Sequence, residues 1–372
     1  MSAAFDTVKH SILLNRLSSD FGISGTANQW LKSYFTDRHQ CINVNGTLSD
    51  PLRLRRGMPQ GSIIGPKGYP PYVSPIFDIA KQHDVSMHMY ADDTQLYVEF
   101  EVSQWKEAKL KMEQCIAEIR SWLEWNCLKL NDGKTEMMII GQSHNLKKLK
   151  DNPTITIGSS IVQSSSSARN IGAVLDEELK MVKHVNSICR ACYSYLYSLG
   201  RIRHYLTEET AVTLVHAFIT CKLDNLNSLL IGLPSCILKK LQHIQNNAAR
   251  IITRTRKHDH ITDVLITLHW LPVEARIEYK VLLLAYKALN GLAPLYLAEL
   301  LHFKQNSRNL RSSDEQLLLV PKTRLKTIGD RSWSFNAAKS WNCLPLKLRS
   351  SQTVSIFKEN LKTYLFRKHF NL

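Results

Sequence analysis

Hydrophobic residues recur with a helical period in some stretches of the chain and with a strand period in others. The clearest helical stretch is 104–123, where apolar side chains three or four residues apart share one face. The same spacing predicts further helices at 8–17, 26–35, 183–199, 208–220, 236–254, 274–290 and 357–370. From about Lys183 onward all of the predicted elements are helical.

Alternation with a period of two is concentrated in the first half of the chain. Between Met87 and Phe100 it predicts two strands joined by the turn Ala91-Asp92-Asp93-Thr94, which would place two carboxylates at a hairpin tip. Further strands are predicted at 41–44, ahead of an Asn-Gly turn, at 137–140, within 154–162 as a hairpin, and at 171–175. The pattern therefore indicates a mixed α+β part followed by a helical part.

Charge and cysteine usage narrow the class of protein. The 48 Lys and Arg exceed the 32 Asp and Glu, and the net charge of +16 favours a polyanionic partner such as nucleic acid, although many basic proteins bind none. The eight cysteines are scattered, which suits a reducing intracellular compartment, nucleus or cytoplasm. Cys189 and Cys192 form the only close pair, and helix packing explains it better than zinc. No membrane span and no secretion signal are predicted.

The adjacent aspartates Asp92 and Asp93 are the strongest candidates for chemistry. Their charges repel, and one Asp or Asn is enough to build a turn. A divalent cation would relieve the repulsion, because Mg²⁺ is commonly held by one or two carboxylates together with substrate phosphates. An isolated Asp-Asp pair is more often a solvated turn, so the assignment depends on the surrounding motifs.

Those motifs come one after another in a recognisable order. They are Ser2-Ala3-Ala4-Phe5-Asp6, then Arg56-Gly57-Met58-Pro59-Gln60-Gly61-Ser62, then Tyr90-Ala91-Asp92-Asp93, then Leu128-Lys129-Leu130-Asn131 with Lys134-Thr135-Glu136, and finally Ala168-Arg169-Asn170-Ile171-Gly172. In this order and spacing they resemble the reverse transcriptases of LINE-type, non-LTR retrotransposons of the jockey and chicken-repeat groups. Stretches of the helical part, such as Lys222 to Leu230, are similar to the region downstream of the polymerase domain in those elements.

The resemblance implies a fold and a division of the chain. The fold class would be α+β, with a partial polymerase palm at 1–182, in which an antiparallel sheet is packed with helices. An α-helical thumb would come next at 183–300, and then a basic, helical C-terminal region at 301–372. Basic residues of the thumb, including Lys183, Arg190, Arg201, Arg203 and His204, would contact the phosphates of a template–primer duplex.

The resemblance also implies residue roles for RNA-templated DNA synthesis. Asp92 and Asp93 would bind Mg²⁺, or Mn²⁺ in its place, and Lys134 would stabilise the departing pyrophosphate. Contacts to template or nucleotide are implied at Arg56, Pro59, Gln60, Gly61 and Tyr90, and a primer grip at Arg169, Asn170 and Gly172. The implied partners are an RNA template, a DNA primer and deoxynucleoside triphosphates. Tyr90 is expected to pack beneath the turn. The alternatives from residue type alone are a solvated lysine for Lys134, a plain turn for Pro59 to Gly61, and a core tyrosine for Tyr90.

Two departures from the family pattern predict weak activity. The first metal-binding aspartate of the family would fall before Ser2, outside this sequence, as would the fingers region, so an N-terminal truncation or a misplaced start is expected. Asp6 matches the second, non-catalytic aspartate of that motif. Pro70 and Pro71 lie where the family has a helix, and a proline in a helix interior costs about 3 kcal/mol. The competing hypotheses are a non-catalytic nucleic-acid-binding remnant and a relic that does not fold stably.

Overall fold

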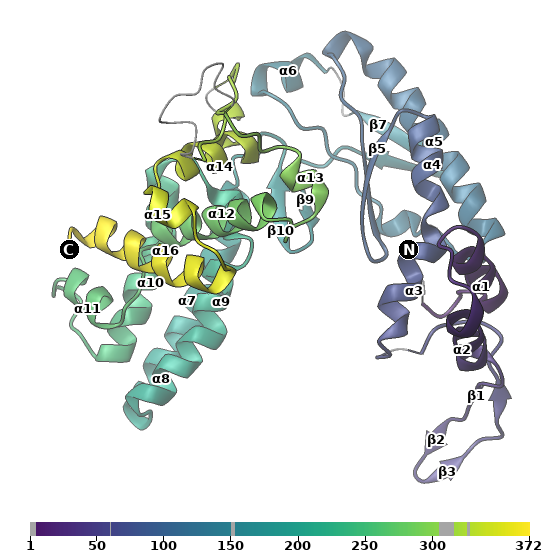
Figure 1. Cartoon of the computed structure of the whole chain (residues 1–372), viewed down its shortest axis with the longest axis horizontal. Helices are drawn as coiled ribbons and strands as arrows, with labels where there is room; N and C mark the ends of the chain where they lie inside the picture. Colours follow the sequence, from purple (N-terminus) through teal and green to yellow (C-terminus); the bar gives the residue numbers. More distant parts are fainter. Residues whose placement is uncertain (1–4, 60, 150–152, 305–315, 326–327) are drawn as a thin grey trace. The chain divides into compact units, whose positions relative to one another are not determined.

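The computed structural model describes residues 5–59, 61–149, 153–304, 316–325 and 328–372. The chain divides into two compact units, residues 1–166 and 167–372 (Figure 1). Helices and short antiparallel hairpins alternate in the first unit, and helices dominate the second. Every sheet among the described residues has two strands. This agrees with a mixed helix and sheet class, as the sequence predicts.

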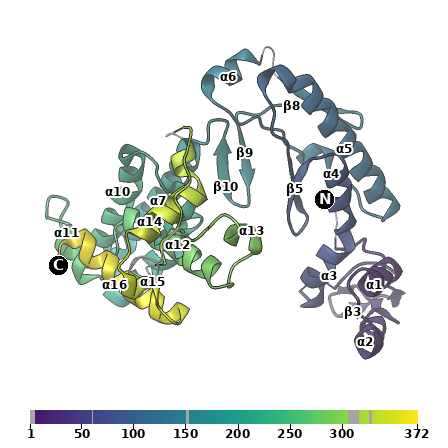
Figure 2. The same ribbon diagram turned by 45° about the horizontal axis from the view of Figure 1, so that its top comes forward.

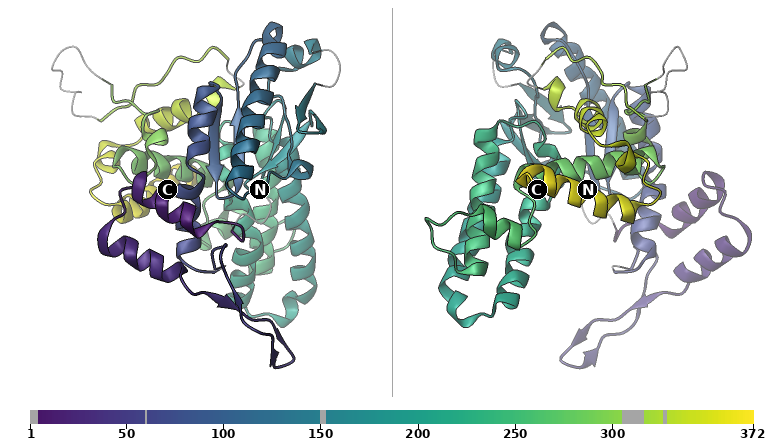
Figure 3. Two further views of the ribbon diagram at one scale, coloured as in Figure 1. Left: turned by 90° about the vertical axis from the view of Figure 1, so that its right-hand side faces the viewer. Right: turned by 60° about the vertical axis from the view of Figure 1, so that its left-hand side comes forward.

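The first unit contains six α-helices and four two-stranded antiparallel sheets among its described residues. The helices are α1 (His10–Ser19), α2 (Gly25–Phe35), α3 (Ile64–Val73), α4 (Pro75–Gln82), α5 (Trp105–Trp125) and α6 (Ser143–Lys148). The hairpins are β5 (Ser86–Tyr90) with β6 (Asp93–Tyr97) and β7 (Thr154–Ile157) with β8 (Ser160–Gln163). A solvent-exposed ladder pairs β1 (His39–Gln40) with β4 (Leu52–Arg53) and β2 (Asn43–Val44) with β3 (Thr47–Leu48), as Figure 3 shows at the purple end of the chain.

One apolar core joins α1, α3, α4 and α5. Leu13, Tyr72, Ile76 and Leu123 are fully buried in it, one from each of these helices. Arg16 adds a polar contact, because its guanidinium lies 5.2 Å from the ring of Trp122 and donates a 3.1 Å hydrogen bond to Asn126 Oδ1. The core thus fixes α3 and α4 against the long helix α5.

Helix α3 corrects the expectation that Pro70 and Pro71 damage this segment. The prolines supply no N–H groups, yet the helix continues to Val73. Tyr69 and Tyr72 are both fully buried, and the Tyr72 hydroxyl donates a 2.6 Å hydrogen bond to the carbonyl of Asn126. Packing in the core therefore overrides the low helix propensity of the two prolines.

Two other expectations for the first unit are also wrong. Residues 137–140 form no strand, and only an isolated bridge joins Met137 to Ser164, because no neighbouring strand completes a ladder there. A tryptophan at the end of an amphipathic helix is expected to pack in the core, yet Trp125 ends α5 and is 85% exposed. The hairpin predicted within 154–162 is confirmed, with Gly158 at positive φ in its turn.

The second unit opens with the hairpin of β9 (Ser167–Asn170) and β10 (Ala173–Asp176), whose strands lie side by side in Figure 2. Its helices are α7 (Val182–Ile202), α8 (Glu208–Val215), α9 (Cys221–Asp224), α10 (Ser235–Thr253), α11 (Thr262–Thr267), α12 (Val273–Leu289), α13 (Leu295–Ala298), α14 (Trp333–Asn342), α15 (Leu346–Arg349) and α16 (Val354–Phe370). Residues 216–220 form a π-helical turn between α8 and α9. The helices predicted from periodicity are therefore present.

Two apolar clusters hold this unit together. In the first, α7 packs along α10 with Val185, Cys192, Ile244 and Ala248 buried between them. In the second, α12 packs against α14 and α16 around Trp341. The burial of Cys192 supports the packing interpretation of the close cysteine pair, and all eight cysteines are free thiols. No described helix is both long and apolar enough to cross a membrane.

Candidate functional site

The two aspartates lie at a tight hairpin turn. Tyr90 pairs with Asp93 across β5 and β6, so Ala91 and Asp92 are the two central residues of the turn. Ala91 has a φ of 54°, the left-handed region that the first central residue of such turns requires and that glycine usually occupies. The Asp93 side chain is exposed and Asp92 is partly exposed. The turn therefore presents both residues at the surface of the first unit.

Tyr90 corrects the expectation that it packs beneath this turn. It is 64% exposed, because side chains along β5 alternate between faces and the inward positions belong to Met87 and Met89. The core beneath the hairpin is thus made of methionines together with Leu96 of β6, and the tyrosine faces solvent.

Tyr69 of α3 is fully buried, and its phenol interacts electrostatically with Asp92 of the hairpin. Burial first, and then the negative charge of Asp92, raises the pKa of the Tyr69 phenol above its ordinary range. The ring of Tyr69 lies 5.1 Å from that of Phe5, centroid to centroid. Three of the sequence motifs are therefore close together here: Phe5 from the first, the helix after the glycine motif, and Asp92 from the hairpin. Sequence reasoning missed Tyr69, whose place between two prolines and a glycine gave no sign of burial.

A second set of contacts joins the first motif to the glycine motif. The N–H of Gly57 donates to the carbonyl of Val8 at 2.8 Å, and the N–H of Met58 donates to that of Phe5 at 2.7 Å. Nε2 of His10 lies 2.7 Å from the Gly57 carbonyl oxygen. A Cβ atom at Gly57 would lie 2.9 Å from the carbonyl oxygen of Asp6, so only glycine allows this approach.

The rest of the glycine motif forms a turn that leads into α3. The N–H of Ser62 donates to the carbonyl of Pro59 at 3.2 Å, and Gly61 has a φ of 79° with open space around it. Arg56 and Pro59 are exposed. Gln60 lies outside the described residues. The turn interpretation and the ligand-contact interpretation of these residues are compatible, because an exposed glycine turn lets a ligand approach the backbone.

Lys134 lies on a short 3₁₀ turn, Asp132–Lys134, and its side chain is exposed. An ion pair between Arg120 and Asp132 anchors this turn to α5. Within the turn, the N–H of Lys134 donates to the Asn131 carbonyl at 3.2 Å.

The predicted primer-grip residues Arg169, Asn170 and Gly172 belong to the second unit. They form the β9–β10 hairpin, with Arg169 exposed and with Ile171 and Gly172 both at positive φ in its turn.

The donors at the hairpin suit a hard divalent cation. Within the described ranges, no group of three or more His, Cys, Asp or Glu side chains is arranged to hold a metal ion. Asp92 and Asp93 supply carboxylate oxygens, which Mg²⁺ prefers, and Mg²⁺ sites with one or two protein carboxylates are completed by phosphates and water. The residues present therefore fit an ion that arrives with a phosphorylated substrate.

Helix α7 carries an exposed stripe of basic and aromatic side chains. Arg190, Tyr193, Tyr197 and Arg201 fall three or four residues apart, and all are exposed. The guanidinium of Arg201 lies 5.9 Å from the ring centre of Tyr197.

Arg203 has a different environment from its neighbours on α7. Its guanidinium donates to the carbonyls of Leu206, Ile251 and Ile252 at 2.6–2.7 Å. These carbonyls occupy the guanidinium, so Arg203 has a structural role in which it binds the C-terminal end of α10. This corrects the expectation that Arg203 contacts phosphates.

Comparison with known proteins gives the class. Residues 1–174 match the family described as reverse transcriptase (RNA-dependent DNA polymerase). The match contains the hairpin with Asp92 and Asp93, the glycine motif, and the β9–β10 hairpin up to residue 174. Residues 1–174 are therefore similar to a reverse transcriptase domain.

The relatives identify the kind of element. The chain is 27% identical over 266 residues, 68% of its length, to a probable RNA-directed DNA polymerase from transposon BS of Drosophila melanogaster. It is 25% identical over 194 residues, 50% of its length, to the RNA-directed DNA polymerase from mobile element jockey of Drosophila funebris. It is 26% identical over 239 residues, 60% of its length, to a probable RNA-directed DNA polymerase from transposon X-element of Drosophila melanogaster. The RNA-directed DNA polymerases of these Drosophila mobile elements are therefore homologues of the chain, and these matches span 28%, 20% and 24% of the relatives' own lengths.

Proposed function

We propose that this chain derives from an enzyme of RNA-templated DNA synthesis and that its reacting centre is the Asp92–Asp93 turn. The observation that carries the proposal is that Tyr69 packs against Phe5 in the core and is close enough to Asp92 for that carboxylate to raise the Tyr69 pKa. Residues from three separate motifs therefore lie near one exposed pair of carboxylates. Asp92 and Asp93 would hold Mg²⁺ or Mn²⁺. When bound, such ions lower the pKa of an attacking hydroxyl and stabilise a leaving oxygen.

The chain's own residues would bind and orient the substrates. Arg56, Pro59, Gln60 and Gly61 would contact the template or the incoming nucleotide, with the glycine turn allowing close backbone approach. Tyr90, exposed on the strand before the turn, would contact the nucleotide from the hairpin side.

Lys134 is exposed and cationic, which suits a role in stabilising the charge of the leaving pyrophosphate.

The second unit would hold the nucleic acid. We propose that residues 183–300 act as the thumb and residues 301–372 as a basic C-terminal region, while 1–182 supply the palm. The stripe on α7 supports this, because basic side chains contact phosphates and aromatic rings stack on bases. Arg169, Asn170 and Gly172 would grip the primer from the β9–β10 turn, whose Arg169 is exposed. RNA template, DNA primer and deoxynucleoside triphosphates are the partners this arrangement suits.

The 372-residue polypeptide is expected to synthesise DNA slowly. Among the described residues no third His, Cys, Asp or Glu side chain is arranged with Asp92 and Asp93 to hold a metal ion, and two carboxylates hold a metal more weakly than three. An upstream-extended polypeptide that supplies a third carboxylate should therefore be faster than the 372-residue form.

Primer extension on an RNA template, with Mg²⁺ or Mn²⁺, tests the proposal. We expect slow synthesis that is abolished by Asp92→Ala and unchanged by Asp50→Ala, which removes the same charge from an exposed loop of the same unit. Synthesis that survives Asp92→Ala would overturn the assignment of the centre. Robust synthesis by the 372-residue form that Asp92→Ala abolishes would overturn only the expectation of weak activity.

A second candidate is a nucleic-acid-binding protein without catalysis. The net charge of +16 and the basic, aromatic stripe on α7 favour it, since both serve binding alone. It predicts a salt-sensitive complex with the template–primer duplex and no extension with either metal, even in the upstream-extended form.

A further inference from the structure

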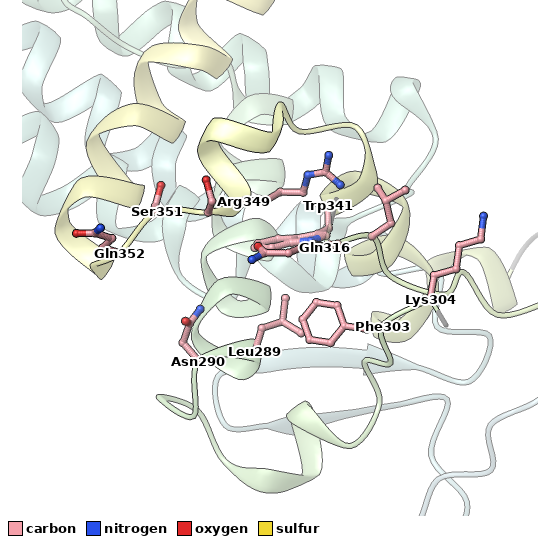
Figure 4. Close-up of a pocket in the computed structure, with 11 residues that line it drawn as sticks. Leu289, Asn290, Phe303, Lys304, Gln316, Trp341, Arg349, Ser351 and Gln352 are labelled. Carbon is pink, nitrogen blue, oxygen red and sulfur yellow. Dashed lines mark hydrogen bonds between the residues drawn. The ribbon is translucent and has the colours of Figure 1, made fainter. Parts of the chain in front are cut away.

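The second unit encloses a cavity that the polymerase chemistry does not use. Its volume is about 600 Å³, within the range of small-molecule sites. The end of α12, residues 303–304 and 316–317, helix α14, and the residues around the start of α16 surround it (Figure 4). The lining is mainly polar, with one apolar wall formed by Leu289, Phe303 and Trp341.

Arg349 at the end of α15 is the unusual residue of this cavity. Only 8% of it is exposed, and its Nε and Nη1 atoms are buried without a hydrogen-bond partner in the described part of the chain. Buried charges are normally paired, because a charge that leaves water without a partner loses its solvation. Figure 4 shows the side chain extending over Trp341. A buried guanidinium without an internal partner indicates that a ligand supplies one.

The charged side chains that line the cavity indicate the sign of the ligand's charge. Arg349 and Lys304 are both cationic, and no Asp or Glu lines the cavity among the described residues. The neighbouring donors are already used within the protein: Trp341 Nε1 donates to the Gln316 carbonyl at 2.9 Å, and Ser351 Oγ donates to the Leu348 carbonyl at 2.8 Å. These bonds fix the walls and leave the two cations to bind an anion.

We propose that this cavity binds the phosphate group of a nucleotide, with the phosphate on Arg349 and the base against Phe303. A guanidinium forms paired, charge-assisted hydrogen bonds with phosphate oxygens. Phe303 is 51% exposed, so its ring is free to contact a flat base. The phosphate belongs either to a free mononucleotide or to the end of a nucleic-acid strand. The site lies in the second unit and does not depend on the proposed polymerase centre.

Isothermal titration of the full chain tests the proposal, with deoxycytidine monophosphate, deoxycytidine, and an oligonucleotide with or without a 5′-phosphate as probes. We expect the phosphorylated probes to bind and deoxycytidine not to bind. Arg349→Met should weaken phosphate binding at least tenfold. Lys347→Met, which removes the same charge from an exposed position on α15, should leave it unchanged.

The thermal midpoint provides a readout that does not depend on titration. Added deoxycytidine monophosphate should raise the midpoint of the wild-type chain and of Lys347→Met, but not that of Arg349→Met. If Arg349→Met does not fold, Lys304→Met at the exposed rim should still weaken binding severalfold. Equal binding by Arg349→Met, or no binding of any phosphorylated probe, would overturn the proposal. Binding of the 5′-phosphorylated oligonucleotide without the mononucleotide would assign the site to strand ends. Asp92→Ala should change neither measurement.

Discussion

Replacing Gly57 with alanine perturbs the contact that joins the first sequence motif to the glycine motif. Its backbone has a φ of 91°, and a Cβ there would lie 2.9 Å from the carbonyl oxygen of Asp6 and 3.3 Å from the Asp6 Cα. Both neighbours are backbone atoms, which cannot rotate away as a side chain would. Gly57 is also held on both sides, by its N–H on Val8 and by its carbonyl on His10.

The cost has two parts that a control variant separates. A left-handed alanine costs about 1–2 kcal/mol, partly offset by about 0.4–1 kcal/mol because alanine has fewer unfolded conformations than glycine. Forcing an extra carbon into a packed contact adds about 1–3 kcal/mol. Gly46, at the exposed β2–β3 turn, has a φ of 87° with nothing within 4 Å of its Cβ position, so Gly46→Ala carries only the first part.

Urea denaturation followed by circular dichroism measures the difference. We expect Gly57→Ala to lower the free energy of unfolding of the first unit by about 1–3 kcal/mol more than Gly46→Ala does, as the contact cost requires. Primer extension should fall in Gly57→Ala and not in Gly46→Ala, because the displaced segment carries Phe5, whose ring packs against Tyr69. Equal destabilisation by both variants would refute the reasoning, since the loss would then reflect backbone strain alone.

The second unit yields two further predictions. Arg201→Gln should weaken binding of a template–primer duplex and reduce the slope of log affinity against log salt concentration by about one. Arg203→Gln should instead lower the thermal midpoint of the chain, because it removes the hydrogen-bond donors of the Ile251 and Ile252 carbonyls. Burial lowers the pKa of His184 below 6.5, and its Nδ1 accepts the N–H of Val174 at 3.3 Å. The folded state therefore disfavours protonation, so stability is complete above pH 6.5 and falls as the pH drops below it. Unfolding midpoints measured from about pH 7.5 to about pH 5 should show this loss in the wild type and a smaller one in His184→Phe.

The sequence pattern predicted those helices and strands whose formation depends on residues close together in the sequence. The hairpin around Asp92 was predicted because alternation from Met87 to Leu96 reports directly which side chains face the core. The helix through Pro70 and Pro71 could not be predicted, since two buried tyrosines hold it through contacts with residues far away in the sequence.

For the site, the sequence identified residue types but not their environments. The carboxylates at the turn were predicted, and the structure presents both at the surface. The exposure of Tyr90 and the support from Tyr69 depend on which face of a strand or helix meets the core, which the motif alone does not specify. Arg203 shows the same limit, because an arginine that binds carbonyls and one that binds phosphates look identical in sequence. Arg349 was not noticed, since only the fold shows that it is buried.

The two-residue turn between β5 and β6 also makes this hairpin intolerant of changes in length. Side chains alternate between faces, so one inserted residue beyond the turn would move Leu96 from the core side to the solvent side and reverse the orientation of Asp93. The exposed ladder around Gly46 has no buried face, so the same insertion there would exchange one solvated side for another. Length variation among relatives should therefore be frequent in residues 39–53 and rare in residues 86–97, although both segments are surface hairpins of the same unit.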